Sequence, residues 1–319
     1  MTISSAQLQL LRNTFGTHVQ ENVSLKRYTA ARIGGKADIL ISVETSAELA
    51  QVTRYCWEHD IPFIILGSGS NILVSEAGVR QLVVLNRAKK IIFYLHSRPA
   101  TVWAESGANF GALARQAASR GLSGLEWAAG IPGTLGGAVY GNAGAHGSDI
   151  SCNLVMADIL HPSPVHGAQK QEILQEDWSV RQFDYEYRSS SIKRQLGKVV
   201  VLSAQLKLGR STPETVQAKM DEYSTIRRNT QPSGASLGSI FKNPDGDFAG
   251  RLIEAAGLKG KKIGKVEVSQ KHANFFINHG NATANDYAGL IRLVQKEVRE
   301  KFGISLELEI ELFGDWTIL

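Results

Sequence analysis

Apolar side chains recur at helical spacing in six parts of the chain. Leu8, Leu11 and Phe15 stand at positions i, i+3 and i+7 before a glycine, which predicts a short amphipathic helix. Thr45 and Glu48 have the spacing of an N-terminal capping box and predict the start of a second helix. By the same criteria we expect helices over residues 5–15, from 46 onward, over 109–120, from 213 onward, up to Gly257, and over 283–302.

Short apolar runs between these helices predict strands. Residues 62–66 contain no polar side chain, which is typical of a buried strand. Residues 304–312 alternate strictly between apolar and polar, which predicts a strand whose wet face carries Glu307, Glu309 and Glu311. The expected strands are 37–43, 62–66, 72–74, 82–85, 90–95, 100–104, 154–160, 199–208, 274–278 and 304–312.

The length of the chain predicts more than one domain. Its 319 residues exceed the roughly 100 to 200 residues of a common domain, so two or three hydrophobic cores are expected. Pro213 suits the first position of a helix, and we predict a domain boundary near residue 211. Residues 130–147 show no periodicity and are expected to be irregular.

Composition and charge narrow the class of protein. Apolar residues make up 43% of the chain, and there is no run of about 18 apolar residues and no secretory leader pattern. We therefore expect a soluble, cytoplasmic protein without a membrane segment. The net charge of +5 suits an anionic small ligand as readily as nucleic acid. Cys56 and Cys152 have no metal-ligand spacing, so we expect two small, buried thiols and no metal site.

Glycine is enriched at 31 residues, and it is clustered. Gly67-Ser-Gly-Ser-Asn71 follows a predicted strand, as phosphate-binding loops do, because glycine lets backbone N–H groups approach a pyrophosphate. A Rossmann loop would open a helix, whereas a strand is predicted here after Asn71, which favours binding by backbone N–H groups of the loop. The alternative is a tight connection without a ligand.

A second cluster has seven glycines between residues 130 and 147. So long a loop with so few side chains is costly in conformational entropy, which indicates that a planar or anionic ligand lies on it. An irregular loop without a ligand is the alternative.

Three further patterns carry less chemistry. Residues 234–238 match Gly-x-Ser-x-Gly, but no strand is predicted before them and no helix directly after, so a serine hydrolase is not expected. The basic run at residues 259–265 lacks interleaved aromatic residues, which favours a solvated face over a nucleic-acid site. The pattern of residues 304–312 does not by itself select one of its three glutamates for a functional role.

Six motifs together resemble the UDP-N-acetylenolpyruvoylglucosamine reductase (MurB) family. They run in order from about residue 27 to 314 and include Tyr187-Arg-Ser-Ser190 and Gly238-Ser-Ile-Phe-Lys-Asn-Pro244. The others are residues 32–38, 65–73, 124–147 and 272–278, and the long glycine motif is highly specific. Residues 191–208 form a short stretch without tyrosine, so the chain is similar to the shorter, second type of this family.

The resemblance implies an α+β protein with three parts. Residues 1–86 and 87–211 would form the two subdomains of an FAD-binding fold of the vanillyl-alcohol-oxidase type, and residues 212–319 a C-terminal α+β substrate domain. The implied flavoenzyme of peptidoglycan precursor synthesis is a monomer with noncovalent FAD. It uses NADPH to reduce an enolpyruvyl ether of a UDP-sugar to UDP-N-acetylmuramate, with no nucleic acid, membrane or metal involved.

The resemblance also assigns roles to individual residues. Arg188 and Glu309 would stabilise an enolate that forms as hydride adds to the enolpyruvyl group, and Ser239 would supply the proton. Substrate contacts would come from Tyr140, Arg227, Arg228, Lys242, Asn243 and His272. Cofactor contacts would come from Gly67, Ser68, Gly69, Ser70, Asn71, Gly130, Ile131, Pro132, Gly133, Thr134, Gly136, Gly137 and Ala138.

Two alternatives stay open at this point. A different flavin oxidoreductase on the same fold would have no need of Ser239. A noncatalytic nucleotide or nucleic-acid binder built on residues 259–265 would take up no FAD. A visible absorption spectrum of the purified protein separates the second alternative from both flavoenzymes.

Overall fold

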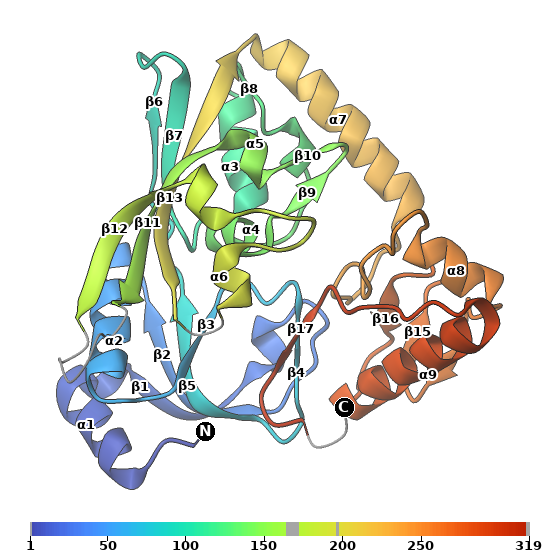
Figure 1. Ribbon diagram of the computed structural model, residues 1–319, viewed down its shortest axis with the longest axis horizontal. Coiled ribbons are helices and arrows are strands. Elements are labelled where there is room, and N and C mark those ends of the chain that lie inside the picture. The colour runs from blue at the N-terminus through green and yellow to red at the C-terminus, as the bar shows by residue number, and fades with distance from the viewer. Residues whose placement is uncertain (1, 164–171, 196–197, 317–319) are drawn as a thin grey trace. The chain divides into compact units, whose positions relative to one another are not determined.

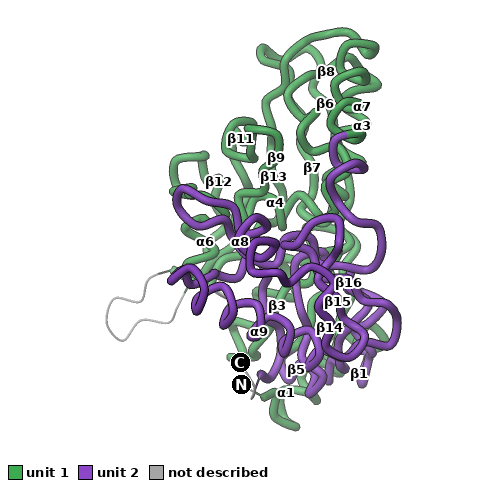
Figure 2. Tube along the Cα trace, turned by 90° about the vertical axis from the view of Figure 1, so that its right-hand side faces the viewer, with its two compact units in different colours: residues 1–19, 40–68, 82–225 green, residues 20–39, 69–81, 226–319 purple. Residues whose placement is uncertain are grey.

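The computed structural model describes residues 2–163, 172–195 and 198–316 (Figure 1). Tertiary contacts divide the chain into two compact units (Figure 2). Unit 1 holds residues 1–19, 40–68 and 82–225, and unit 2 holds residues 20–39, 69–81 and 226–319. The chain passes from unit 2 to unit 1 within two strands, β2 (Lys36–Val43) and β5 (Val79–Asn86).

An antiparallel sheet is the main element of unit 1. Its strands follow the order β12 (Ile173–Ser179), β11 (Leu154–Pro162), β13 (Val200–Arg210), β7 (Ala100–Glu105) and β6 (Ile91–Tyr94), and the short β8 (Leu122–Ser123) pairs with the end of β13. Two helices, α3 (Phe110–Ala118) and α4 (Leu135–Gly141), share a hydrophobic core with this sheet. Leu113 and Leu135 from the helices and Val102 and Leu206 from the strands are all buried there.

Unit 1 contains further helices and strands. The strand β3 (Phe63–Leu66) runs parallel to β5, with Phe63 opposite Leu82. The others are α1 (Ser5–Phe15), α2 (Ser46–Glu58), β9 (Gly144–Ala145), β10 (Ser148–Asp149), α5 (Ile150–Asn153), α6 (Ser191–Arg194) and most of α7 (Pro213–Thr230).

Unit 2 packs two helices against short strands. The helices α8 (Ala249–Ala255) and α9 (Ala284–Phe302) share a core with the three-stranded sheet β14 (Lys262–Ile263), β15 (Val266–Val268) and β16 (Phe276–Asn278). The fully buried Tyr287 donates a hydrogen bond from its hydroxyl to the carbonyl of Phe276 (3.0 Å). Two strands far apart in sequence, β4 (Ile72–Val74) and β17 (Glu311–Phe313), pair in parallel. The strand β1 (Val19–Ser24) precedes β2 in the order β1-β2-β5-β3.

Capping residues determine where several helices begin. Asn109 and Thr283 accept hydrogen bonds from the backbone N–H groups of Ala112 and Asp286, at the starts of the helices expected over 109–120 and 283–302. Thr45 caps α2 through the N–H of Glu48, but the Glu48 carboxylate accepts from Glu44 N rather than from Thr45 N. The predicted reciprocal capping box at α2 is therefore only half formed.

Three local predictions are wrong. Residues 130–147 are not irregular throughout, because Thr134 caps the helix α4 within them. Residues 304–310 do not form a regular strand: the Leu306 carbonyl accepts from the Gln295 side chain (2.9 Å), and Leu308 takes part only in an isolated bridge to Phe241. Cys152 is exposed, since the buried positions of its short helix are Ile150 and Asn153.

The structure also bears on the expected absence of a membrane segment. In the described ranges no helix combines the length and the apolar character that crossing a membrane would require. The three-part division at residues 86 and 211 stays a prediction.

Candidate functional site

The two glycine segments singled out in the sequence meet in unit 1. A Cβ atom added to Gly67 would lie 2.8 Å from Thr134 Oγ1, which is closer than real side chains approach. The segment around Thr134 is held in turn by backbone hydrogen bonds from Phe110 N to Gly133 O (3.1 Å) and from Gly136 N to Ser106 O (2.8 Å). Gly67 is therefore required for the close packing of the two segments.

Residues 69–71 of the first glycine segment belong to unit 2. Gly69 has a φ of +61°, and a Cβ there would lie 2.0 Å from the Tyr28 carbonyl oxygen, so a side chain would clash with backbone. Asn71 donates from Nδ2 to the carbonyl of Glu309 (3.0 Å), and its own carbonyl accepts from Glu311 N (2.8 Å). Asn71 thus fixes the backbone of the residue that the motifs assign as the catalytic carboxylate.

The helix α4 presents backbone on one side. Gly137 is exposed, and a Cβ there would find its nearest heavy atom, Thr134 Oγ1, at 3.6 Å. Gly136 is different, since a Cβ there would lie 2.8 Å from Ser106 Cβ. Gly130 and Pro132, just before the helix, are also exposed. A planar ring can approach the Gly137 side of α4 without meeting a side chain at that position, so these residues fit a flavin.

Arg188 lies in a turn that is fastened to α4 and to the segment after it. Its φ of 57° is left-handed, which is uncommon for a residue other than glycine. Three carbonyls of the segment accept hydrogen bonds from the turn: Val139 from Tyr185 Oη (2.9 Å), Tyr140 from Ser190 Oγ (2.6 Å) and Gly144 from Arg188 Nη2 (3.0 Å). These bonds hold the guanidinium of Arg188 at the second glycine segment.

Ser239 lies in unit 2, in an extended segment between the segment of Phe275 and the segment of Leu308. Its backbone forms a bridge with Phe275, and Glu309 N donates to the carbonyl of Ile240 (2.8 Å). The side chain of the buried Asn274 makes two hydrogen bonds to the backbone of Phe241, two residues after Ser239. It accepts from Phe241 N (3.0 Å) and donates from Nδ2 to Phe241 O (2.8 Å), and these two bonds clamp Phe241. The backbones that carry Ser239 and Glu309 are thereby joined within one unit.

Comparison with known proteins identifies the family. The chain matches the model of the UDP-N-acetylenolpyruvoylglucosamine reductase C-terminal domain over residues 230–313 and an FAD binding domain over residues 37–162. It is 43% identical to the UDP-N-acetylenolpyruvoylglucosamine reductase of Rubrobacter xylanophilus over 91% of this chain and 94% of that one. The chain belongs to the UDP-N-acetylenolpyruvoylglucosamine reductase family.

Two further relatives support this assignment. UDP-N-acetylenolpyruvoylglucosamine reductase 2 of Bacillus cereus is 38% identical over 93% of each chain. The crystal structure of the reductase (MurB) from Thermus caldophilus superposes with a TM-score of 0.75 at 34% identity and covers 91% of this chain and 97% of that one. The predicted family and α+β fold class are confirmed, while the roles of single residues, and membership of the shorter type, stay predictions. Residues 196 and 197, within the stretch that suggested that type, lie outside the described residues.

The three glutamates near the C-terminus differ in their surroundings. Glu307 is largely exposed and pairs with Lys242 Nζ at 3.3 Å, and Lys242 N donates to its carbonyl (2.9 Å). Glu309 and Glu311 are partly buried. Asn71 fixes the backbone at both Glu309 and Glu311, through its Nδ2 to the Glu309 carbonyl and through its own carbonyl to Glu311 N.

The other predicted substrate residues lie on several elements. Burial lowers the pKa of the Arg227 guanidinium, and Arg228 next to it accepts a hydrogen bond at its carbonyl from Lys271 Nζ (2.6 Å). The side-chain oxygen of Asn243 accepts a hydrogen bond from the N–H of Ala249, the first residue of α8 (3.1 Å). The pKa of His272 is lowered, chiefly by burial. Tyr140 is the residue whose carbonyl binds Ser190, and its ring lies 5.9 Å from the ammonium group of Lys193.

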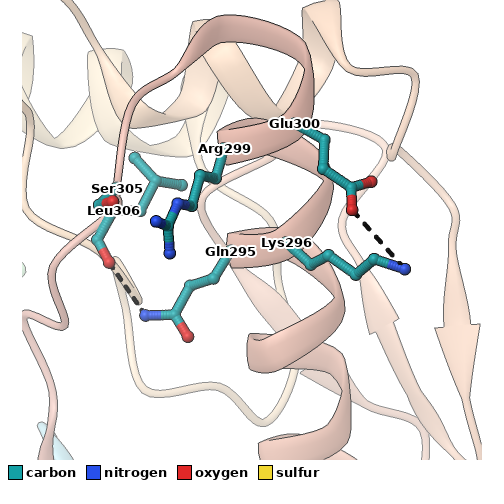
Figure 3. A pocket seen from close by; sticks show the side chains of 6 residues that line it. All are labelled: Gln295, Lys296, Arg299, Glu300, Ser305 and Leu306. Carbon is teal, nitrogen blue, oxygen red and sulfur yellow. Dashed lines mark hydrogen bonds and ion pairs between the residues drawn. The ribbon is translucent and has the colours of Figure 1, made fainter.

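Two cavities occur away from these residues. The larger, about 650 Å³, lies in unit 2, where Arg299 and Gln295 of α9 face Ser305 and Leu306 (Figure 3). The smaller, about 490 Å³, lies in unit 1 beside α2, where burial raises the pKa of Asp158. None of the residues predicted for catalysis, cofactor or substrate lines either cavity, so the family motifs and these cavities are separate features.

Sequence reasoning missed two residues that organise the site. Asn142 donates from Nδ2 to the carbonyl of Glu186 (3.0 Å), and Asn274 clamps Phe241. Both lie inside recognised motifs, but a local pattern does not reveal bonds to residues 44 and 33 positions away. Neither bond leaves a signal in the sequence; the structure shows that both amides are buried, where a polar group needs partners.

Proposed function

We propose that the protein binds FAD noncovalently and uses NADPH to reduce the enolpyruvyl ether of UDP-N-acetylglucosamine to the lactyl ether of UDP-N-acetylmuramate. The observation that carries the proposal is family membership together with an FAD binding domain over residues 37–162. When bound, FAD transfers hydride equivalents from NADPH to the substrate. The exposed Gly137 side of α4 supports the position of the flavin.

Arg188 and Glu309 act on the charge that develops in the reaction. When hydride reaches the terminal methylene of the enolpyruvyl group, negative charge develops on the adjacent carbon and its carboxylate. Arg188 supplies a permanent cation for that charge, and its bond to Gly144 O keeps the side chain in one arrangement before substrate arrives. A protonated Glu309 donates a hydrogen bond to the same carboxylate.

Ser239 supplies the proton that completes the reduction. Its hydroxyl gives a proton to the carbon next to the carboxylate, so that one hydride and one proton saturate the double bond. A serine hydroxyl is a weak acid, so the proton transfer needs assistance. The basicity of the enolate, or the positive charge of Lys242 or Arg227, provides it. The clamp of Asn274 on Phe241 supports this role, because it fixes the segment that carries Ser239.

Cationic and polar residues bind the UDP-sugar. Arg227, Arg228 and Lys242 supply positive charge for the diphosphate and the carboxylate, in keeping with the net charge of +5. Tyr140, Asn243 and His272 complete the substrate contacts. We further propose that the protein acts as a monomer in the cytoplasm.

The test separates the two halves of the reaction. Stopped-flow absorbance follows loss of the flavin colour on addition of NADPH and its return on addition of the enolpyruvyl substrate. Ser239→Ala should leave the first half unchanged and slow the second by roughly 10² to 10⁴, the loss typical of a missing general acid. If colour returns at the wild-type rate, or if the first half slows equally, the assignment of Ser239 is wrong. Colour that returns with oxygen but not with the enolpyruvyl ether would indicate a different flavin oxidoreductase.

A further inference from the structure

Asn142 carries a hydrogen-bond acceptor that the described protein leaves unused. The residue is 5% exposed and ends α4 in the left-handed conformation, with a φ of 46°. Its Nδ2 donates to the carbonyl of Glu186 (3.0 Å), whereas its buried Oδ1 has no hydrogen-bond partner in the described ranges. An unsatisfied buried polar atom costs about 1 to 3 kcal/mol, so its presence requires an explanation.

The orientation of the amide is fixed by its one bond. The Glu186 carbonyl can only accept, so the NH2 group of Asn142 must face it and the oxygen must face the other way. Exchanging the two atoms would leave two oxygens in contact. The unused atom is therefore an acceptor, and its partner must be an N–H or O–H donor.

This requirement selects among the groups that the proposed ligands offer. Phosphate oxygens and carboxylates accept hydrogen bonds and do not donate them at neutral pH, so the pyrophosphate and the enolpyruvyl carboxylate are excluded. The flavin ring carries an N–H group and the ribityl chain carries hydroxyls. Asn142 lies five residues after Gly137, the exposed glycine of the same helix, and inside the matched FAD binding domain.

We propose that Asn142 Oδ1 accepts a hydrogen bond from an N–H or O–H group of bound FAD. The inference rests on the proposed function and deepens it, because the same side chain also holds the turn that carries Arg188. One amide thus contacts the cofactor through oxygen and fastens the turn at residues 186–189 through nitrogen. The same residue thus links the cofactor to the turn that carries Arg188, so Asn142 is a positioning residue with respect to Arg188.

Three variants separate the two bonds of this amide. Asn142→Gly tolerates the left-handed backbone and removes both bonds. Asn142→Asp keeps an acceptor toward the ligand, but its other carboxylate oxygen faces Glu186 O, so the bond to the turn is replaced by repulsion. Ser190→Ala is the matched control, because it removes another bond between the same turn and α4, from Ser190 Oγ to Tyr140 O, and leaves Asn142 intact.

The measurement is the FAD dissociation constant of the apoprotein, followed by quenching of flavin fluorescence, with thermal unfolding as a check on folding. We expect Asn142→Gly to weaken FAD binding about tenfold. Ser190→Ala should stay within about threefold of wild type, which is less than one hydrogen bond. In the enzyme reconstituted at saturating FAD, Asn142→Asp should lower kcat with little change in KM, because Arg188 is less well held.

The contrary outcomes are distinct. Unchanged FAD affinity in a folded Asn142→Gly variant would mean that an ordered water satisfies Oδ1, and the inference would fail. Weakening by Ser190→Ala as strong as by Asn142→Gly would trace the effect to the turn and would also overturn it. A selective loss of UDP-sugar affinity would assign the donor to the substrate instead. Wild-type apoprotein that binds no FAD would refute the proposed function itself, before any variant is measured.

Discussion

A methyl group added at Gly137 tests whether the exposed side of α4 binds the flavin. Gly137→Ala would add a Cβ whose nearest heavy atom is 3.6 Å away, an ordinary contact that the protein accommodates. The same helix offers two controls. Gly141→Ala adds a Cβ with no heavy atom within 4 Å, and Gly136→Ala adds one only 2.8 Å from Ser106 Cβ.

The expected effects on stability and on binding have opposite signs. Replacing a helical glycine by alanine stabilises a protein by roughly 0.5 to 1 kcal/mol, because the unfolded chain loses freedom. For a protein of this size that raises the apoprotein Tm by about 1 °C. A methyl group forced against a packed ring costs about 1 to 3 kcal/mol, which weakens FAD binding roughly 5- to 150-fold. Gly137→Val, which is β-branched, should weaken binding further.

The assay combines thermal unfolding of the apoprotein with fluorescence titration of FAD. Gly141→Ala should raise the Tm without changing the FAD dissociation constant, and Gly136→Ala should lower the Tm. The decisive comparison is Gly137→Ala against Gly141→Ala. If both bind FAD as tightly as the wild type, the exposed side of α4 does not face the flavin and the reasoning is refuted.

Three further predictions concern the cofactor, the thiols and pH. Acid precipitation should release the flavin into the supernatant, since neither cysteine lies in an attachment motif; colour kept in the washed pellet would contradict noncovalent binding. Ellman's reagent should label the exposed Cys152 and not Cys56 in the native protein, because burial raises the pKa of Cys56 to about 12, and both should react in denaturant. Hydrogen bonds from Arg251 lower the pKa of Asp247 to about 2, whereas the ordinary pKa of an aspartate is near 3.9. The pair therefore stabilises the fold fully above about pH 3.9, and this stabilisation is lost as pH falls through 2. Asp247→Asn should therefore lower the Tm at neutral pH, and a difference from wild type that was undiminished at pH 2 would show another cause.

Side-chain spacing predicted the elements that have a continuous apolar face. The helix α9 begins at its Thr283 cap and ends before Gly303, as expected from the pattern. The helix α4 was missed because three of its seven residues are glycine, which has low helix propensity; the Thr134 cap and burial of Leu135 stabilise it instead. Residues 304–312 alternate as a strand does, but alternation specifies which side chains are buried and does not specify a neighbour for the backbone.

Part of the candidate site could be assigned from the sequence because of its motifs rather than its side-chain spacing. The motifs led to the correct family and brought attention to the segments around Arg188 and Ser239, whose catalytic roles remain predictions. The bonds that hold those segments, from Asn142 and Asn274, join residues that are distant in sequence. Local patterns carry no information about such pairs, so the structure was needed to find them.

The pairing of β4 with β17 has a consequence for how the protein is made. Ile72, Leu73 and Val74 are buried in unit 2, yet their partners are Glu311, Leu312 and Phe313, which are synthesised much later. At a synthesis rate of about 5 to 20 residues per second, β4 waits roughly 12 to 50 s on the ribosome before its neighbour exists. During that interval an apolar strand edge is open to other nascent chains, so a chaperone that shields β4 should raise the yield of folded protein more than one that acts after release.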